Sequence, residues 1–261
     1  MEINLQNKTA WVFGGSRGIG RAIAIKLAEA GANILLIARN RANLLLVKDS
    51  LCVKKKQEHD LLVVDVANTQ KLGDLLRSYY NVGAVDIVIN NSGGPKSGPA
   101  HTAGIDEYVG AFSQHVLAAQ VIASVALPIM KKRGGGRIIN IISTSVKQPI
   151  GGLGVSNTVR GAMANWSKTV AGEVGGFGVT VNNILPGATK TDRLVEIISK
   201  KAEQVGSPVE LIKKKMKGDI PIGRFGFPEE VAYLAVFLCS KYADYINGIN
   251  IPVDGGRTKS L

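Results

Sequence analysis

Short apolar runs alternate with longer segments of helical spacing along the whole chain. Seven runs rich in Val, Ile and Leu lack strict alternation, as is typical of strands buried on both faces; they span residues 9–13, 33–37, 61–64, 87–89, 137–142, 179–185 and 248–253. Six segments with helical spacing separate them: 20–30, 41–55, 69–79, 105–131, 158–174 and 229–240. The alternation predicts an α/β fold in which one domain, residues 1–261, forms a doubly wound parallel sheet of about seven strands with helices on both faces.

Residues 191–226 depart from this pattern, because they are polar, lysine-rich and helical only in parts. A long insertion at such a point favours a lid-like segment over a second domain. Lys200, Lys201 and Lys213 to Lys215 lie within it, and their charge suggests an acidic carrier protein or a phosphorylated substrate as a partner.

Composition narrows the class of protein. An apolar content of 45% suffices for a substantial core, no stretch is long and apolar enough to span a bilayer, and the polar N-terminus lacks the features of a secretory signal. We therefore expect a soluble, cytoplasmic protein with no membrane partner. The only cysteines, Cys52 and Cys239, argue against a disulfide framework or a zinc site, and no metal is expected.

The net charge of +12 raises the question of a polyanionic partner. Lys54 to Lys56 and Lys131 to Arg133 fall near predicted helix ends or turns, where solvated charge is normal. No helix-turn-helix, zinc-finger or aromatic RNA-binding pattern accompanies them, so we expect no nucleic-acid partner. A basic protein that binds nucleic acid or a membrane surface is the last-ranked alternative, and its binding would depend steeply on salt.

A glycine turn joins the first predicted strand to the first predicted helix. Its candidate nucleotide contacts are Gly14, Ser16, Arg17, Gly18, Ile19 and Gly20. Glycine allows a tight turn and a close approach of backbone N–H groups to a pyrophosphate, while the helix N-terminus adds partial positive charge. Because a strand precedes the turn and a helix follows it, the motif predicts dinucleotide binding on a Rossmann-type fold.

The end of the second predicted strand indicates which dinucleotide binds. An NAD site places Asp or Glu there to hold the ribose 2′-hydroxyl, whereas this chain has Ala38, Arg39 and Asn40. Arg39, together with Arg17, can hold a 2′-phosphate through charge-assisted hydrogen bonds. NADP(H) is therefore the predicted cofactor; the alternative for Arg39, a solvated residue after a strand, stays open.

Further motifs follow the glycine turn in order: Asp65-Val66, Asn90-Asn91-Ser92-Gly93, Ser143, Pro186-Gly187 with Thr191, and Val253-Asp254-Gly255-Gly256. Together they resemble the short-chain dehydrogenase/reductase family over essentially the whole chain, and within it most resemble the β-ketoacyl-acyl-carrier-protein reductase branch. The resemblance implies a homotetramer built through the long helices on either side of the fifth strand. It also implies cofactor contacts at Asp65, Val66, Asn91, Ser92, Gly93, Pro186, Gly187, Thr189 and Thr191.

The chain departs from this family at the catalytic residues. The resemblance implies a serine, a tyrosine, a lysine four residues later and an asparagine on the preceding helix, and ungapped counting places Ser143, Ser156, Arg160 and His115 there. Only Ser143 matches, and residues 137–183 contain no tyrosine. Ser156 is a much weaker acid than a phenol. Arg160 cannot give up a proton, although its planar fork can hold the nicotinamide ribose hydroxyls.

Three side chains keep two interpretations each. His115 is either a proton donor near neutral pH or a packed, hydrogen-bonded histidine. Lys147 either reaches the pocket or points to water, and Ser143 either orients a carbonyl oxygen or caps the strand end.

Two functions follow from these residues. The first is an NADPH-dependent oxidoreductase that reduces a small carbonyl or acyl thioester substrate through a non-standard proton relay. In it Ser143 polarises the substrate oxygen, and His115 or a water beside Ser156 delivers the proton. The alternative is a non-catalytic NADP(H)-binding protein that retains the fold.

Overall fold

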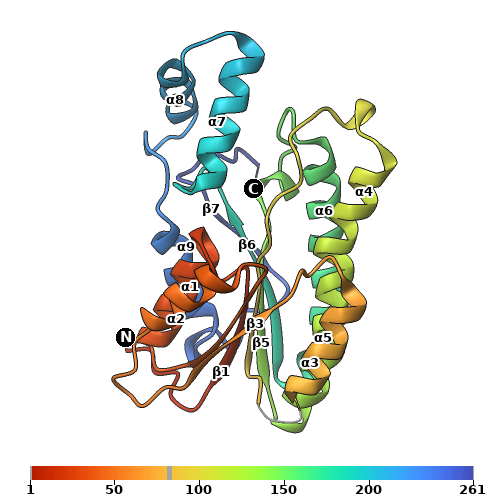
Figure 1. Ribbon diagram of the computed structural model, residues 1–261, viewed down its shortest axis with the longest axis vertical. Coiled ribbons are helices and arrows are strands. Elements are labelled where there is room, and N and C mark those ends of the chain that lie inside the picture. The colour runs from red at the N-terminus through yellow and green to blue at the C-terminus, as the bar shows by residue number, and fades with distance from the viewer. Residues whose placement is uncertain (1, 81–83, 261) are drawn as a thin grey trace.

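The computed structural model describes residues 2–80 and 84–260, and within them one sheet of seven parallel strands forms the centre (Figure 1). The strand order is β3-β2-β1-β4-β5-β6-β7. The strands are β1 (Thr9–Phe13), β2 (Asn33–Ala38), β3 (His59–Val63), β4 (Ile87–Asn90), β5 (Gly136–Ile141), β6 (Val179–Pro186) and β7 (Asn250–Val253). This order confirms the predicted doubly wound fold. It places the reversal of winding between β1 and β4, where ligands bind in such sheets.

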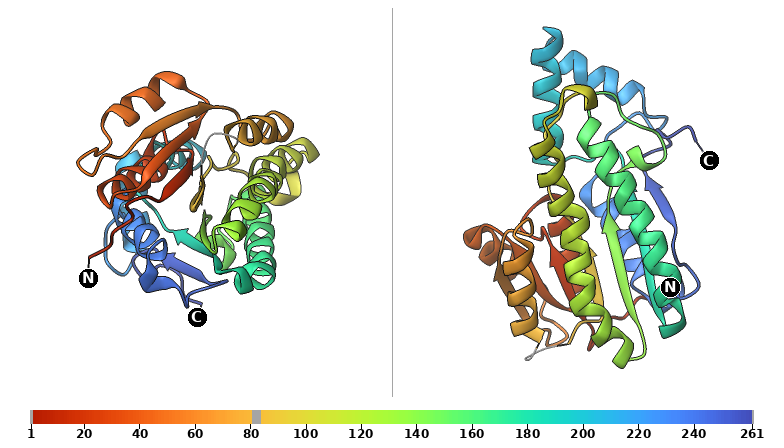
Figure 2. Two further views of the ribbon diagram at one scale, coloured as in Figure 1. Left: turned by 90° about the horizontal axis from the view of Figure 1, so that it is seen from below. Right: turned by 90° about the vertical axis from the view of Figure 1, so that its right-hand side faces the viewer.

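Helices cover both faces of the sheet (Figures 1 and 2). One face carries α1 (Gly18–Glu29), α2 (Arg41–Asp49) and α9 (Pro228–Leu238); the other carries α3 (Thr69–Tyr80), α4 (Ile105–Phe112), α5 (Ala118–Lys132) and α6 (Gly154–Val174). Short 3-10 turns lie at Ala100–Thr102, Thr144–Val146, Gly175–Phe177 and Lys241–Ala243.

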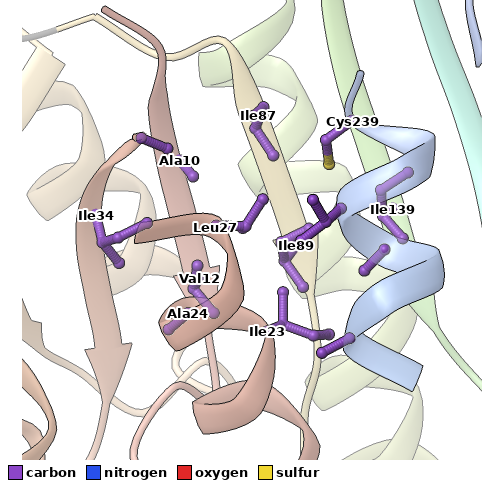
Figure 3. Close-up of a cluster of buried hydrophobic side chains, with 14 of the residues drawn as sticks. Ala10, Val12, Ile23, Ala24, Leu27, Ile34, Ile87, Ile89, Ile139 and Cys239 are labelled. Atoms are coloured by element: carbon purple, nitrogen blue, oxygen red, sulfur yellow. The ribbon is translucent and has the colours of Figure 1, made fainter. Parts of the chain in front are cut away.

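Alternate residues of each central strand serve two separate cores. Ala10 and Val12 of β1 pack in the cluster that includes Ile23 and Leu27 of α1 (Figure 3), whereas Trp11 on the same strand packs in the cluster on the opposite face. Side chains alternate across a strand, so burial on both sides makes the strand apolar throughout. This explains why the strand runs lack an alternating pattern.

The segment predicted as one helix over 105–131 is interrupted. A π-helical turn at Ser113–Leu117 separates α4 from α5, and His115 lies within it. Such turns interrupt the regular hydrogen-bond ladder, often at functional sites, and apolar spacing alone does not reveal them.

The same segment corrects the expectation that no stretch is apolar enough to span a bilayer. By length and composition alone, Ile105–Lys132 qualifies, and 50% of its apolar window is buried inside the structure. It is apolar because α5 packs against the sheet, so the finding is weak evidence for a membrane span.

Two predicted helix boundaries also differ by more than two residues. The helix predicted over 41–55 ends at Asp49, where the Ser50 hydroxyl donates to the Val47 carbonyl, and Lys56 adopts a left-handed φ of 61° as the chain turns toward β3. The helix predicted over 158–174 begins earlier, at Gly154. A Cβ on Gly154 would lie 2.3 Å from the Ala100 nitrogen, so close packing rather than helical spacing determines that start.

Residues 191–226 contain two helices, α7 (Asp192–Val205) and α8 (Val209–Gly218), which project beyond the carboxyl ends of the strands (Figure 1). They share a small core of their own, which contains Leu194, Ile198, Ala202, Ile212, Ile220 and Phe225. That this segment acts as a lid stays a prediction.

Candidate functional site

The glycine turn and the end of β4 form one closely packed unit. A Cβ on Gly14 would lie 2.5 Å from Asn91 Nδ2, and a Cβ on Gly20 would lie 2.2 Å from the Gly14 oxygen. Asn91 Nδ2 in turn donates to the carbonyl oxygens of Phe13 and Gly14, each at 3.3 Å. Two motifs that the sequence presents far apart therefore hold each other in place at the end of the winding reversal.

The N-terminus of α1 faces outward with its first backbone N–H groups free of a side-chain cap. Arg17 occupies the N-cap position without capping the helix, and the first turn carries no acidic residue. Such a terminus attracts an anion through its N–H groups and its dipole. Ser16 and Ile19 flank it, both half-buried.

Two arginine side chains border this terminus. Arg17 is 69% exposed with its Nη1 3.8 Å from Asp192, and Arg39 is 73% exposed with its Nη1 3.6 Å from Asp65. Exposed pairs at these distances are weak, so both guanidinium groups remain available to a phosphate. Asp65, a cofactor contact implied by the family resemblance, thus pairs with the arginine expected at the 2′-phosphate.

The loop after β6 packs between the C-terminal motif and the glycine turn. A Cβ on Gly187 would lie 2.7 Å from Asp254 Cβ, and a Cβ on Gly18 would lie 3.2 Å from Thr191 Cγ2. The Thr189 hydroxyl donates to the Gly187 oxygen at 3.2 Å, and the Thr191 hydroxyl accepts from the Leu194 N–H to cap α7. Pro186 to Thr191 therefore borders the same edge of the sheet as the glycine turn.

A cavity of about 20 Å³ lies beside this edge and joins residues that the sequence suggested separately. Its lining includes Val66, Asn91, Ser92, His115 and Arg160. Gly93 lies next to it, and its carbonyl accepts from Gln114 Nε2 at 3.0 Å.

The two serines at the catalytic positions stand outside this lining. The Ser143 Oγ accepts from the Ser145 N–H at 3.1 Å, and Ser156 lies half-buried in the first turn of α6. Among the described residues no hydrogen bond joins either serine to Arg160.

Arg160 is a buried cation with one hydrogen-bond partner among the residues that the structure describes. Its Nη1 donates to the Ile141 carbonyl at 3.0 Å, and it enters no ion pair within residues 2–80 and 84–260. Burial, followed by the like charge of Arg193, lowers the pKa of Arg160 to about 10, so the guanidinium is still charged at neutral pH.

His115 is buried and neutral beside this cation. Its Nδ1 lies 2.7 Å from the Ser92 hydroxyl. Burial, followed by the positive charge of Arg160, lowers the pKa of His115 to about 2. At neutral pH the ring is therefore uncharged, and it can pass a proton only by exchanging protons between its two nitrogens.

Several residues of this region were missed from the sequence. Asn140, Asn183 and Asn250 form a hydrogen-bonded series with Asn90, and Arg193 of α7 donates to the Pro95 carbonyl. The available signal was the recurrence of asparagine within or directly after four successive apolar runs. Lys147 is half-buried, and its carbonyl accepts from the Ser260 hydroxyl at 3.4 Å, which leaves both interpretations of its side chain open.

Comparison with known proteins places this site in a family. A family model described as enoyl-(acyl carrier protein) reductase matches residues 14–258. The match covers most of the chain, includes the glycine turn and coincides with the observed sheet order. The chain belongs to the short-chain dehydrogenase/reductase family, as its motifs had indicated.

Relatives and solved structures agree with this assignment. The chain is 30% identical over 259 residues to the NADPH-dependent reductase BacG of Bacillus subtilis, covering 98% of this chain and 100% of that protein. It is 32% identical to the 3-oxoacyl-[acyl-carrier-protein] reductase FabG of Aquifex aeolicus, covering 98% and 99%. The crystal structure of L-sorbose reductase from Gluconobacter frateurii, complexed with NADPH and L-sorbose, matches with a TM-score of 0.93 at 33% identity over 100% of both chains.

Proposed function

We propose that this chain is an NADPH-dependent reductase of a small carbonyl or 3-oxoacyl substrate. The observation that carries the proposal is the free N-terminus of α1, which follows a turn with no room for a side chain at Gly14 or Gly20 and lies between the exposed Arg17 and Arg39. These residues fit the pyrophosphate and the 2′-phosphate of NADP(H). Relatives described as NADPH-dependent or 3-oxoacyl reductases support the same reaction class.

The remaining site residues have distinct proposed roles. When bound, NADPH supplies a hydride to the substrate carbonyl carbon, and the carbonyl oxygen takes up a proton to give the alcohol. The Arg160 guanidinium holds the ribose hydroxyls, and the Ser143 hydroxyl orients the substrate oxygen. The proton comes from a water beside Ser156 or through the neutral ring of His115, whose Nδ1 lies 2.7 Å from the Ser92 hydroxyl.

The alternative is a non-catalytic NADP(H)-binding protein, favoured by the lack of a phenol at position 156. Losing a general acid costs about 10² to 10⁴-fold in rate, whereas positioning the reactants supplies several orders of magnitude by itself. A slow reductase is therefore the better supported of the two.

Comparative titration of NADPH and NADH, followed by single-turnover mixing with ketones and 3-oxoacyl thioesters, tests the proposal. We expect tighter binding of NADPH and measurable oxidation of it. Tight NADPH binding without hydride transfer at high enzyme concentration would favour the alternative, a non-catalytic NADP(H)-binding protein.

The double variant Ser156→Tyr with Arg160→Lys separates the two functions further. A large gain in its reductase activity would show that the pocket accepts a carbonyl. Its failure to gain activity while binding NADPH tightly would again favour the binder.

We also propose a cytoplasmic homotetramer. Support comes from exposed apolar side chains along α4 and the π-helical turn that follows it: Val109 is 58%, Phe112 40% and Leu117 42% exposed. Apolar exposure on adjacent turns is typical of an interface. Mass photometry should show a tetramer, and Leu117→Glu should shift it toward smaller species; a monomer of the unmodified protein would refute the tetramer. Cell fractionation should recover the protein in the soluble fraction, and recovery with the membranes would refute the cytoplasmic location.

A further inference from the structure

Four asparagine side chains form a continuous hydrogen-bonded line across the sheet, which we call the asparagine ladder. Asn90, Asn140, Asn183 and Asn250 are direct register partners on β4, β5, β6 and β7. Asn90 Nδ2 donates to Asn140 Oδ1 at 2.7 Å, Asn140 Nδ2 to Asn183 Oδ1 at 2.9 Å, and Asn183 Nδ2 to Asn250 Oδ1 at 2.8 Å. Every amide therefore donates in the same direction, away from β4.

The hydrogen bonds around Asn140 fix this direction. The Ser167 hydroxyl donates to the Met163 carbonyl at 2.7 Å, so it can only accept from Asn140 Nδ2, which lies 2.9 Å away. The nitrogen of Asn140 must then face Ser167, and its oxygen must face Asn90. Asn90 consequently donates with Nδ2 and leaves Oδ1 as the free end of the ladder. Aligned amides polarise one another, so this free end is the negative end.

The negative end of the ladder belongs to a residue that lines the same cavity as the buried cation. Asn90, His115 and Arg160 all line the cavity of about 20 Å³. Asn90 Oδ1, His115 Nε2 and Arg160 Nε are buried, and each lacks a hydrogen-bond partner among the described residues. Leaving one such atom unpaired costs about 1–3 kcal/mol, more for a charged group, so three such atoms on residues that line one cavity point to a ligand.

We propose that one bound water accepts a hydrogen bond from Arg160 Nε, donates one to Asn90 Oδ1 and contacts His115 Nε2, so that the asparagine ladder positions the Arg160 guanidinium. Asn90 and Asn140 are then positioning residues that act through Arg160. The cavity, at about 20 Å³, has room for about one water molecule. A monatomic anion would meet the lone pairs of Asn90 Oδ1, and a cation would meet Arg160. A neutral molecule that both donates and accepts satisfies all three atoms.

A crystal structure of the full chain tests the occupant directly. We expect one water within hydrogen-bond distance of all three atoms, and no anomalous peak there after a bromide soak. A bromide peak in the cavity, or a cavity without density, would overturn the proposal. This test is independent of the proposed function.

Nitrogen-15 NMR of histidine-labelled protein tests the positioning role. The chain has three histidines, so His115 is assigned by its loss in His115→Asn. Asn90→Leu keeps the approximate shape of the side chain and removes the acceptor of the water; we expect a changed His115 Nε2 shift and NADPH binding weakened about tenfold. Asn250→Ala removes the far end of the ladder and leaves the cavity lining intact. We expect it to change the His115 Nε2 shift in the same direction as Asn90→Leu but by less. It therefore keeps the test available if Asn90→Leu fails to fold.

Thr180→Val is the matched control, because Thr180 lies on β6 as Asn183 does, and its buried hydroxyl stands outside the ladder. It should leave the His115 shift and NADPH binding within about twofold of the unmodified protein. An unchanged His115 shift in both ladder variants would overturn the positioning role. The NADPH readout rests on the proposed function: no NADPH binding by the unmodified protein would contradict that function and leave the water and NMR results standing.

Discussion

Gly14→Ala tests whether the contact between the glycine turn and Asn91 constrains the cofactor site. Gly14 has a φ of 63°, and a Cβ there would lie 2.5 Å from Asn91 Nδ2 and 2.6 Å from the Asn91 carbonyl oxygen. The substitution therefore adds two separate costs, one from the left-handed backbone and one from overlap with a neighbour.

The two costs add in the free energy of unfolding. Placing alanine at this φ costs about 1–2 kcal/mol, and overpacking costs about 1–3 kcal/mol, which gives about 2–5 kcal/mol for the variant. Gly134→Ala is the matched control: its φ is 77°, nothing lies within 4 Å of a Cβ there, and it precedes the opposite end of β5. It should lose only the backbone share, about 1–2 kcal/mol.

Urea unfolding and NADPH titration by fluorescence measure both effects. To make room, Asn91 must move, and its hydrogen bonds to Phe13 and Gly14 lengthen from 3.3 Å. Gly14→Ala should therefore bind NADPH at least about tenfold more weakly, a loss of about 1.4 kcal/mol, whereas Gly134→Ala should bind it normally. Equal stability and equal NADPH affinity in the two variants would refute the reasoning. Gly14 would then be required only for its left-handed backbone conformation and not for its close contact with Asn91.

Three further predictions concern charge. The pKa of His115 is about 2 in the folded protein against an ordinary 6.5. As the pH falls below 6.5, His115 becomes protonated in the unfolded chain but stays neutral in the folded protein, so the folded protein loses stability. Between pH 7 and pH 5, His115→Asn should lose about 2 kcal/mol less than the unmodified protein in urea unfolding; equal losses would contradict this. Arg39→Ser should weaken NADPH at least about tenfold and spare NADH in fluorescence titrations, and equal weakening would exclude a 2′-phosphate contact. Lys214→Glu with Lys215→Glu, two lysines outside every ion pair of the described residues, should slow turnover of carrier-linked but not free 3-oxoacyl substrates, and equal slowing would count against carrier docking.

The sheet could be predicted because its strands are buried on both faces. Trp11 and Val12 point to opposite cores and are both fully buried, so the run around them is apolar without interruption. The interruption at Ser113–Leu117 could not be predicted, because the segment carries apolar residues on its exposed side as well as its buried side, so the phase shift of one inserted residue leaves no gap in the pattern. The start of α6 depended on the close approach of Gly154 to Ala100, a contact between segments far apart in sequence.

In the candidate site, too, features carried by consecutive residues could be predicted, and features that depend on contacts between distant segments could not. The glycine turn carries its chemistry in consecutive residues, so the sequence alone indicates an anion site. The asparagine ladder depends on the register of four strands, and β4 neighbours β5 only after a connection of more than 40 residues. No local pattern states that Asn90 and Asn140 are partners. The charge of His115 likewise depends on burial beside Arg160, which the sequence does not encode locally.

The substitutions at positions 115 and 160 make sense as a pair. A lysine buried in this cavity would tend to lose its proton, because burial lowers the pKa of an ammonium group that has no carboxylate partner. Arg160 stays charged with a pKa of about 10, and burial, followed by the Arg160 charge, lowers the pKa of His115 and keeps it neutral. The negative end of the asparagine ladder then belongs to a residue that shares its cavity with a permanent cation rather than a titrating one. Under the proposed function, the site therefore holds a fixed positive charge beside the ribose of the cofactor, and Arg160 does not supply the proton for reduction.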